Sequence, residues 1–174
     1  MCTGLLFATT MMLAQAPAPK APPKSPPATV SATIGGKSVT ITYSSPRVRG
    51  REGKIFSKDG LISHDPHYPV WRAGANSATT LETSGDLKIG DVTVPAGKYT
   101  LFVDISDPKA WVLIISKATG EWGLAYDPSK DLGRTTMTMT PPAAMVEDLT
   151  YTIGGGKLTL QWENMGASVP IAAK

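Results

Sequence analysis

Apolar and polar residues alternate with a period of two along most of the chain after residue 28, which is the pattern of half-buried β-strands. Turn residues separate the alternating runs at hairpin spacing. Three pairs of runs show this pattern: 29–34 with 39–43 across Gly35-Gly36, 99–105 with 111–115 across Asp107-Pro108, and 149–153 with 158–162 across a run of glycines. No segment here keeps helical spacing over several turns. We therefore predict an all-β fold, an antiparallel β-sandwich of the Greek-key or jelly-roll kind.

The same alternation assigns side chains to the core. Four large apolar side chains fall on the predicted inner faces of their strands and are expected to be buried: Leu101, Trp111, Leu160 and Trp162. Residues 134–140 alternate Met with Thr, and β-branched Thr favours a strand. We expect Met137 and Met139 to pack in the core rather than to bind a soft metal.

One segment, residues 45–83, breaks the alternation and is rich in glycine and charge. Loops longer than about 12–15 residues in a compact domain are usually functional or disordered. This irregular segment is therefore the first place to look for a site. A shorter stretch, residues 122–128, indicates a strand that ends in a turn at Asp127-Pro128.

The N-terminal residues differ in composition from the rest of the chain. An uncharged apolar run ends in Ala14-Gln15-Ala16, the small-x-small pattern of a cleavage site, although no basic residue precedes the run. We predict a signal peptide over residues 1–16, a proline-rich linker over 17–27 and a single β-sandwich domain over 28–174. The leader predicts export, to the periplasm or outside the cell.

Composition narrows the function classes further. Cys2 is the one cysteine among 174 residues, which excludes an intramolecular disulfide framework and a cysteine-based zinc site. A lipidated cysteine needs an apolar leader before it, and only Met1 precedes Cys2 here, so a lipid anchor at Cys2 requires a true start that lies upstream. No apolar run approaches the roughly 20 residues of a spanning helix, so we expect no transmembrane segment.

The net charge of +3 arises in one stretch. Residues 46–60 carry five basic side chains against two acidic ones, and the rest of the chain is close to neutral. Arg47, Arg49 and Arg51 alternate there, so on an extended segment they would point to one side, about 7 Å apart. Guanidinium groups bind carboxylates and phosphates through paired hydrogen bonds, which makes an anion site reasonable. We favour the other interpretation, that they hold the carbonyls and carboxylates of the loop itself. Nucleic acid is not an expected partner, because no aromatic residues interleave the basic run.

A second polar group closes the irregular segment. Trp71, Arg72 and Asn76 lie close together around Gly74 and bring several hydrogen-bond donors beside an indole. They are suited to hold a small polar or anionic ligand or a glycan. They are equally suited to form a buried network that pins the loop, with Trp71 in the core. The candidate ligand-binding residues are Arg47, Arg49, Arg51, Trp71, Arg72 and Asn76.

Several short motifs of the chain occur together in one known family. The pieces are Ser45-Pro46, 47–51, Ile55-Phe56, 71–76, 78–80, 94–102 and Trp162-Glu163. On these pieces the sequence resembles, over roughly residues 28–171, a bacterial exported family known as domain of unknown function 2911, and the stretch 71–76 is the most specific. The family carries no established reaction, so the resemblance implies an exported context. Members often place Glu directly after the asparagine where this chain has Ser77, so no acid–base role of that carboxylate carries over.

The two histidines are weak metal candidates. His64 and His67 have a spacing that permits two imidazoles on one ion, with Asp59 or Asp65 as an oxygen ligand. Pro66 forbids a regular helix between them, and no third ligand has motif spacing. We therefore expect neither a metal nor another cofactor.

The sequence contains no nucleophile elbow, zinc-protease motif or phosphate-binding loop. Ser44, Ser45 and Ser77 have only two histidines to activate them. We therefore predict first a non-catalytic binding or structural module of the cell envelope, whose partner protein the sequence does not name. The alternative is a small exported hydrolase around Arg72 and Asn76. A polar pocket with a titratable group beside either residue would favour the enzyme, whereas a flat or filled surface would favour the module.

Overall fold

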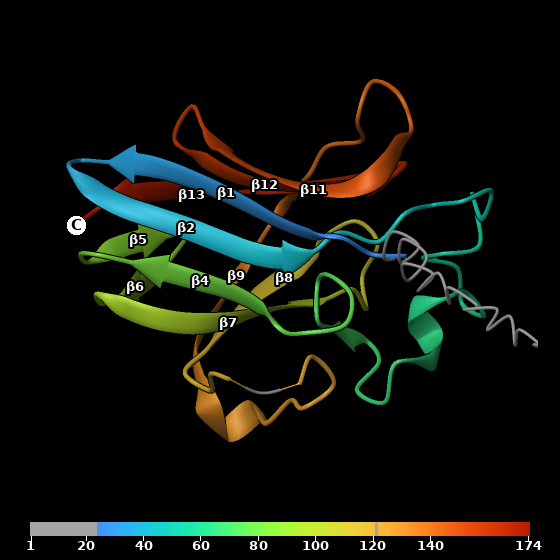
Figure 1. Cartoon of the computed structure of the whole chain (residues 1–174), viewed down its shortest axis with the longest axis horizontal. Coiled ribbons are helices and arrows are strands. Elements are labelled where there is room, and N and C mark those ends of the chain that lie inside the picture. Colours follow the sequence, from blue (N-terminus) through green and yellow to red (C-terminus); the bar gives the residue numbers. More distant parts are fainter. Residues whose placement is uncertain (1–23, 121) are drawn as a thin grey trace, which may run out of the picture.

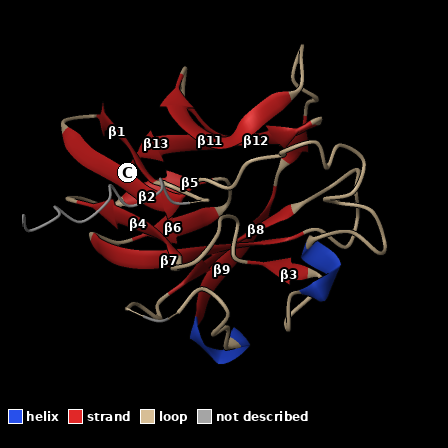
Figure 2. Ribbon diagram, turned by 45° about the vertical axis from the view of Figure 1, so that its right-hand side comes forward, coloured by secondary structure: helices blue, strands red, loops and turns tan. Residues whose placement is uncertain are grey.

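The computed structural model describes residues 24–120 and 122–174, so the predicted signal peptide and most of the predicted linker lie outside the described residues. Two antiparallel β-sheets pack face to face around one hydrophobic core, which confirms the predicted sandwich (Figures 1 and 2). Helical structure in the described residues is limited to two short 3-10 turns, η1 (Ile62–His64) and η2 (Pro128–Lys130). No helix in the described part of the chain is long and apolar enough to cross a membrane.

The first sheet has the order β1-β2-β4-β7-β8-β9, and β3 pairs with β7. Its strands are β1 (Pro27–Ile34), β2 (Lys37–Ser44), β3 (Val70–Trp71), β4 (Thr79–Thr83), β7 (Gly97–Asp104), β8 (Val112–Ser116) and β9 (Asp131–Thr136). The hairpins β1–β2 and β7–β8 are those that the alternation predicted.

The second sheet has the order β11-β12-β13-β5-β6, and β10 pairs with β13. Its strands are β5 (Leu87–Ile89), β6 (Val92–Val94), β10 (Thr138–Met139), β11 (Val146–Gly154), β12 (Lys157–Glu163) and β13 (Met165–Ala173). The hairpin β11–β12 is the third one predicted. The Met and Thr run forms two strands rather than one, because β9 pairs in the first sheet and β10 in the second.

The core lies between the sheets and contains the side chains that the alternation assigned to it. Leu101, Trp111, Leu160 and Trp162 are each at most 2% exposed, as predicted. Met137 is also buried, at the point where the chain crosses between the sheets, and Met139 is partly buried against the same core. The periodicity therefore identified the inner faces correctly.

Two sequence expectations about irregular chain were wrong. Residues 79–83 form the central strand β4 and do not belong to the loop. The inward positions of this strand include Thr79 and Thr83, both buried, so polar residues hide the alternation there. Residues 122–128 do not form a strand, because Trp122 makes a single bridge to Ser77 and the chain then continues as a loop to η2.

The shortened irregular segment, residues 45–78, lies at one end of the sandwich. The strands β1 and β4 begin at this end and β2 ends there, since Pro27 pairs with Ser44 and Thr42 pairs with Thr80. Both η1 and β3 belong to the segment (Figure 2). The C-terminus lies at the opposite end, beside the turn of the β1–β2 hairpin (Figure 1).

Candidate functional site

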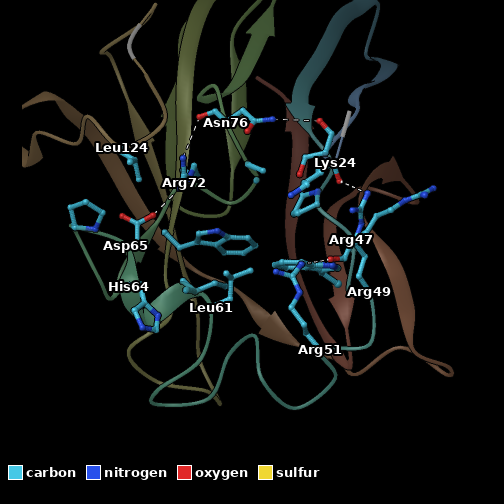
Figure 3. Close-up of a pocket in the computed structure, with 18 of the residues that line it drawn as sticks. Lys24, Arg47, Arg49, Arg51, Leu61, His64, Asp65, Arg72, Asn76 and Leu124 are labelled. Atoms are coloured by element: carbon cyan, nitrogen blue, oxygen red, sulfur yellow. Dashed lines mark hydrogen bonds and ion pairs between the residues drawn. The ribbon is translucent and has the colours of Figure 1, made fainter. Parts of the chain in front are cut away.

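Side chains at the end of the sandwich with the irregular segment enclose a pocket of about 830 Å³. Its walls come from four parts of the chain: residues 24–25 before β1, the segment 46–76, the loop 122–124 and the end of β12. The structure brings all six candidate ligand-binding residues into these walls: Arg47, Arg49, Arg51, Trp71, Arg72 and Asn76. Figure 3 shows the three arginines of the basic stretch on one side of the pocket and Asp65 on the other.

The loop 72–78 fills a gap between two strands. Both β3 and β4 pair in line with β7, so the chain between them bulges out of the sheet. Ala73 and Asn76 have left-handed φ angles of 49° and 55° that turn the backbone. The carbonyl of Ala73 accepts hydrogen bonds from the hydroxyls of Tyr151 (2.9 Å) and Thr79 (3.2 Å), both buried. The backbone of the loop is thereby fixed to both sheets.

Arg72 projects from this loop toward a buried carboxylate. Its Nε lies 3.7 Å from Oδ2 of Asp65, and its Nη1 donates to the carbonyl of Asn76 (3.3 Å). Asp65 directly follows η1, and its Oδ1 accepts from the N–H of His67 (3.2 Å). The Asp65 side chain is 6% exposed and the Arg72 side chain 20%. Within the described residues, the buried Nε of Arg72 has no hydrogen-bond acceptor, so this wall keeps unused hydrogen-bonding capacity.

The basic stretch 47–51 is not extended, contrary to the expectation from its alternation. The N–H of Arg51 donates to the carbonyl of Val48 (3.1 Å), and Arg49 and Gly50 have φ angles of 50° and 70°. A tight turn therefore replaces the pleat that would have set the side chains about 7 Å apart on one face. All three arginines nevertheless line the pocket.

The three guanidinium groups have different partners. Arg47 Nε lies 2.6 Å from Oδ1 of Asp148, and this hydrogen-bonded ion pair raises the pKa of Arg47. Arg51 donates to the carbonyls of Val48 (3.0 Å) and Arg47 (2.6 Å), the loop-holding role that we favoured. Arg49 Nη2 donates to the carbonyl of Lys24 (3.3 Å). Among the described residues, neither Arg49 nor Arg51 forms an ion pair with a carboxylate.

Two indoles of the core form the inner wall of the pocket. Trp71 and Trp162 stack with ring centroids 5.9 Å apart and planes at 18°, and Phe56 lies edge-on to both. Trp71 is 3% exposed, so it is a core residue and a lining residue at once. The buried Nε1 of Trp162 has no acceptor among the described residues. The aromatic wall therefore carries one unused donor.

Two exposed apolar side chains, Trp122 and Leu61, form an apolar rim at one part of the pocket. Trp122 is 58% exposed and Leu61 is 44% exposed, and both line the pocket. Gly123 lies against the Arg72 loop so closely that a Cβ atom would come within 2.6 Å of the Asn76 carbonyl and 2.8 Å of Arg72 Cδ. The lack of a side chain at Gly123 therefore lets Trp122 approach the site.

Several lining residues were absent from the sequence prediction. Lys24, Trp122 and Leu124 come from segments far from the basic loop, and nothing in their local sequence connects them with it. Asp65 was considered only as a metal ligand between the two histidines. The Trp-Gly pair at 122–123, in a stretch without clear alternation, was the one signal that could have pointed to the rim.

The two histidine side chains have different partners. His64 lines the pocket, and its Nδ1 lies 2.9 Å from the carbonyl of Gly60. The ring of His67 packs edge-on to Tyr126, with centroids 5.8 Å apart. No group of three or more His, Cys, Asp or Glu side chains in the described part of the chain is placed to hold a metal ion.

A family model matches residues 25–171 of the chain, and its description is DUF2911, a protein of unknown function. The chain belongs to this family. The matched range includes every residue that lines the pocket except Lys24. The comparison with curated proteins gave no significant match, and neither did the comparison with solved structures. The DUF2911 name carries no reaction, so the function has to be argued from the residues of the pocket.

Proposed function

We propose that this DUF2911 domain is a non-catalytic binding module whose pocket takes a small anionic ligand. The observation that carries the proposal is the charge of the lining residues, which include five basic side chains and one carboxylate, that of Asp65. The basic residues are Lys24, Arg47, Arg49, Arg51 and Arg72. Arginine side chains bind carboxylates and phosphates through short charge-assisted hydrogen bonds.

Ion pairing within the protein offsets only part of this charge. Asp148 faces Arg47, Asp65 faces Arg72, and the Glu147 carboxylate accepts a hydrogen bond from the N–H of Arg49 (2.9 Å). Arg49 and Arg51 use their guanidinium groups on backbone carbonyls, which are neutral. A surplus of positive charge beside low-dielectric aromatic walls attracts and holds anions. The pocket is therefore suited to an anion in the free protein.

Backbone strain also supports a functional role for this end of the sandwich. Four non-glycine residues in the described part of the chain have left-handed φ angles: Arg49, Ala73, Asn76 and Glu163. Arg49 and Asn76 line the pocket, and the other two are chain neighbours of lining residues. Such conformations cost of order 1–3 kcal/mol each, and they gather at active sites and ligand clamps.

The proposal includes export to the periplasm or outside the cell. It rests on the uncharged apolar run and the Ala14-Gln15-Ala16 pattern of the predicted signal peptide. Mass spectrometry of the protein from an exporting host is expected to find a mature chain that begins at Pro17. A cytoplasmic protein that keeps Met1 would contradict export.

One observation favours a second candidate, a small exported hydrolase. Asp65 is a titratable group beside Arg72 in a polar pocket, the arrangement expected of the enzyme. The hydroxyl of Ser45 donates to the carbonyl of Leu149 (2.7 Å), and no serine hydroxyl hydrogen-bonds to an imidazole among the described residues. A nucleophile with its base is thus not assembled. Asp65 would act alone, whereas glycoside hydrolysis uses two carboxylates. We therefore place binding first.

Isothermal titration calorimetry with citrate and with inorganic phosphate tests the proposed function. We expect single-site binding that weakens about tenfold in Arg49→Ala, since a lost charge-assisted hydrogen bond costs about 1.5–3 kcal/mol. Lys54→Ala is the matched control, because Lys54 is an exposed cation of the same basic segment and does not line the pocket. No binding of either anion, or an equal loss in both variants, would contradict the proposal. Hydrolysis of a chromogenic ester or glycoside that is lost in Asp65→Asn would establish the second candidate instead.

A further inference from the structure

We infer that the anionic ligand is an acidic oligosaccharide, a short chain of sugar rings that carry carboxylates. The inference rests on the proposed anion-binding function and narrows it to a ligand class. It follows from the different chemistry of the pocket walls, each of which requires a different group on the ligand.

The first wall requires negative charge. Arg49 and Arg51 lie on this side with Lys24, and the Arg49 guanidinium reaches the backbone of Lys24 (3.3 Å) (Figure 3). The guanidinium fork of arginine matches the planar, two-oxygen geometry of a carboxylate. Because the cations are spread over several residues rather than focused on one point, the wall fits more than one carboxylate.

The opposite wall requires hydrogen-bond donors. The Asp65 carboxylate lines the pocket with a side chain 6% exposed, and an ionised carboxylate only accepts hydrogen bonds. Phosphate and simple polycarboxylates offer this carboxylate few hydroxyl donors, so we expect them to bind more weakly than a ligand that combines carboxylates with many hydroxyls. Sugar hydroxyls donate and accept, so they satisfy Asp65 and the amide of Asn76 alike.

The aromatic wall requires a flat apolar face with polar edges. Trp71 and Trp162 form the inner wall, and Trp122 stands exposed at the rim. Because Trp71 and Trp162 are nearly fully buried, the exposed indole of Trp122 is the ring on which the C–H face of a sugar can pack, while the hydroxyls and ring oxygen of the sugar remain at the edges.

The size of the pocket agrees with an oligosaccharide. Its volume of about 830 Å³ lies in the upper part of the range of about 300–1,000 Å³ for small-molecule sites. An acidic peptide also combines carboxylates with N–H donors, but it offers few flat apolar ring faces to the exposed indole of Trp122. The walls therefore favour the sugar, and an acidic peptide is an outcome that the test must distinguish.

Calorimetric titrations of the protein with four probes test the inference. The probes are trigalacturonate, its methyl ester, triglutamate and citrate. We expect trigalacturonate to bind at least about tenfold more tightly than its neutral methyl ester, since each tenfold step corresponds to about 1.4 kcal/mol. Trp122→Ala is expected to weaken trigalacturonate about tenfold, as loss of a stacking aromatic does, and to weaken citrate by clearly less. Arg49→Ala should weaken both acids, and Lys54→Ala neither.

The outcomes separate the inference from the proposed function. If citrate binds through Arg49 but trigalacturonate binds no more tightly than its methyl ester, the ligand is not an acidic oligosaccharide. The proposed anion-binding function would then still stand. Tighter binding of triglutamate than of trigalacturonate would assign an acidic peptide instead. If neither citrate nor trigalacturonate binds, the proposed function fails together with the inference.

Discussion

The two ends of the sandwich turn the chain in different ways. At the end with the β1–β2 and β11–β12 hairpins, the turns are short and their left-handed positions are all glycine: Gly35, Gly36, Gly155 and Gly156. At the pocket end, long connections replace the short turns, and non-glycine residues occupy four left-handed positions: Arg49, Ala73, Asn76 and Glu163. Glycine adopts such angles freely, whereas other residues are strained in them.

The two ends also differ in the size and the charge of their surface hollows. The groove beside the hairpin turns has a volume of about 320 Å³, and none of its lining residues is charged. The pocket at the other end is larger and carries five basic side chains. One end is therefore built from conformations that fold without strain. The other keeps strain and unbalanced charge, which selection for stability alone would remove.

The largest expected effect lies where the pocket meets the core. Trp162→Ala should lower the free energy of unfolding by about 3–5 kcal/mol, because it leaves a cavity beneath the pocket. Trp122→Ala is the matched control, since its indole is 58% exposed, and should change stability by no more than about 0.5 kcal/mol. Denaturant unfolding followed by circular dichroism measures both. A Trp162→Ala variant with the wild-type midpoint would contradict the assignment of this tryptophan to the core.

Within the pocket, Arg72 and Arg49 should behave differently. Arg72→Ala leaves the buried Asp65 carboxylate without its cation, and we expect a loss of about 1–3 kcal/mol in the free energy of unfolding. The double variant with Asp65→Asn should recover part of this loss. Arg49→Ala removes an exposed side chain and should stay within about 0.5 kcal/mol of wild type. If Arg72→Ala unfolds at the same midpoint as Arg49→Ala and the wild type, Arg72 does not stabilise the pocket wall.

The smallest expected effect concerns backbone strain, which can be compared directly between the two ends of the sandwich. Asn76→Ala places a side chain that disfavours left-handed angles at φ 55° and should cost about 1 kcal/mol, whereas Asn76→Gly should cost nothing by this route. Gly36→Ala is the counterpart at the hairpin end, because a Cβ atom added there would meet no other atom within 4 Å and only the backbone is affected. Thermal unfolding should show similar losses for Asn76→Ala and Gly36→Ala. A loss for Asn76→Gly as large as that for Asn76→Ala would mean that the amide contacts matter more than the backbone.

The hairpins could be predicted from the sequence because their determinants are local. Gly35-Gly36 and the glycines after Ile153 sit between alternating runs, and turn and strands need no distant partner. The central strand β4 was hidden for an equally local reason, since Thr79 and Thr83 occupy buried positions that the alternation assigns to apolar residues.

The pocket could be predicted only as a set of candidates. The arginines and the 71–76 motif stood out in the sequence, but the partners that give them their roles lie far along the chain. Arg47 pairs with Asp148, and Glu163 accepts from the N–H of Gly53 (2.6 Å). The strain at Arg49 was also invisible, because nothing in the residue itself requires a left-handed angle. The positive charge of the basic stretch could be read from the sequence, whereas the arrangement of the charged side chains around the pocket became visible only in the fold.

The indole resonances of the four tryptophans test the central claim most directly. Trp71, Trp122 and Trp162 line the pocket, whereas Trp111 is buried behind them, edge-on to Trp71 at 6.4 Å, and does not line it. In a ¹⁵N NMR titration of the protein with citrate, we expect the indole signals of the three lining tryptophans to shift together along one binding curve, while the Trp111 signal shifts least. Binding of citrate that leaves all four indole signals unchanged, or that moves Trp111 as much as the others, would contradict an anion site in this pocket.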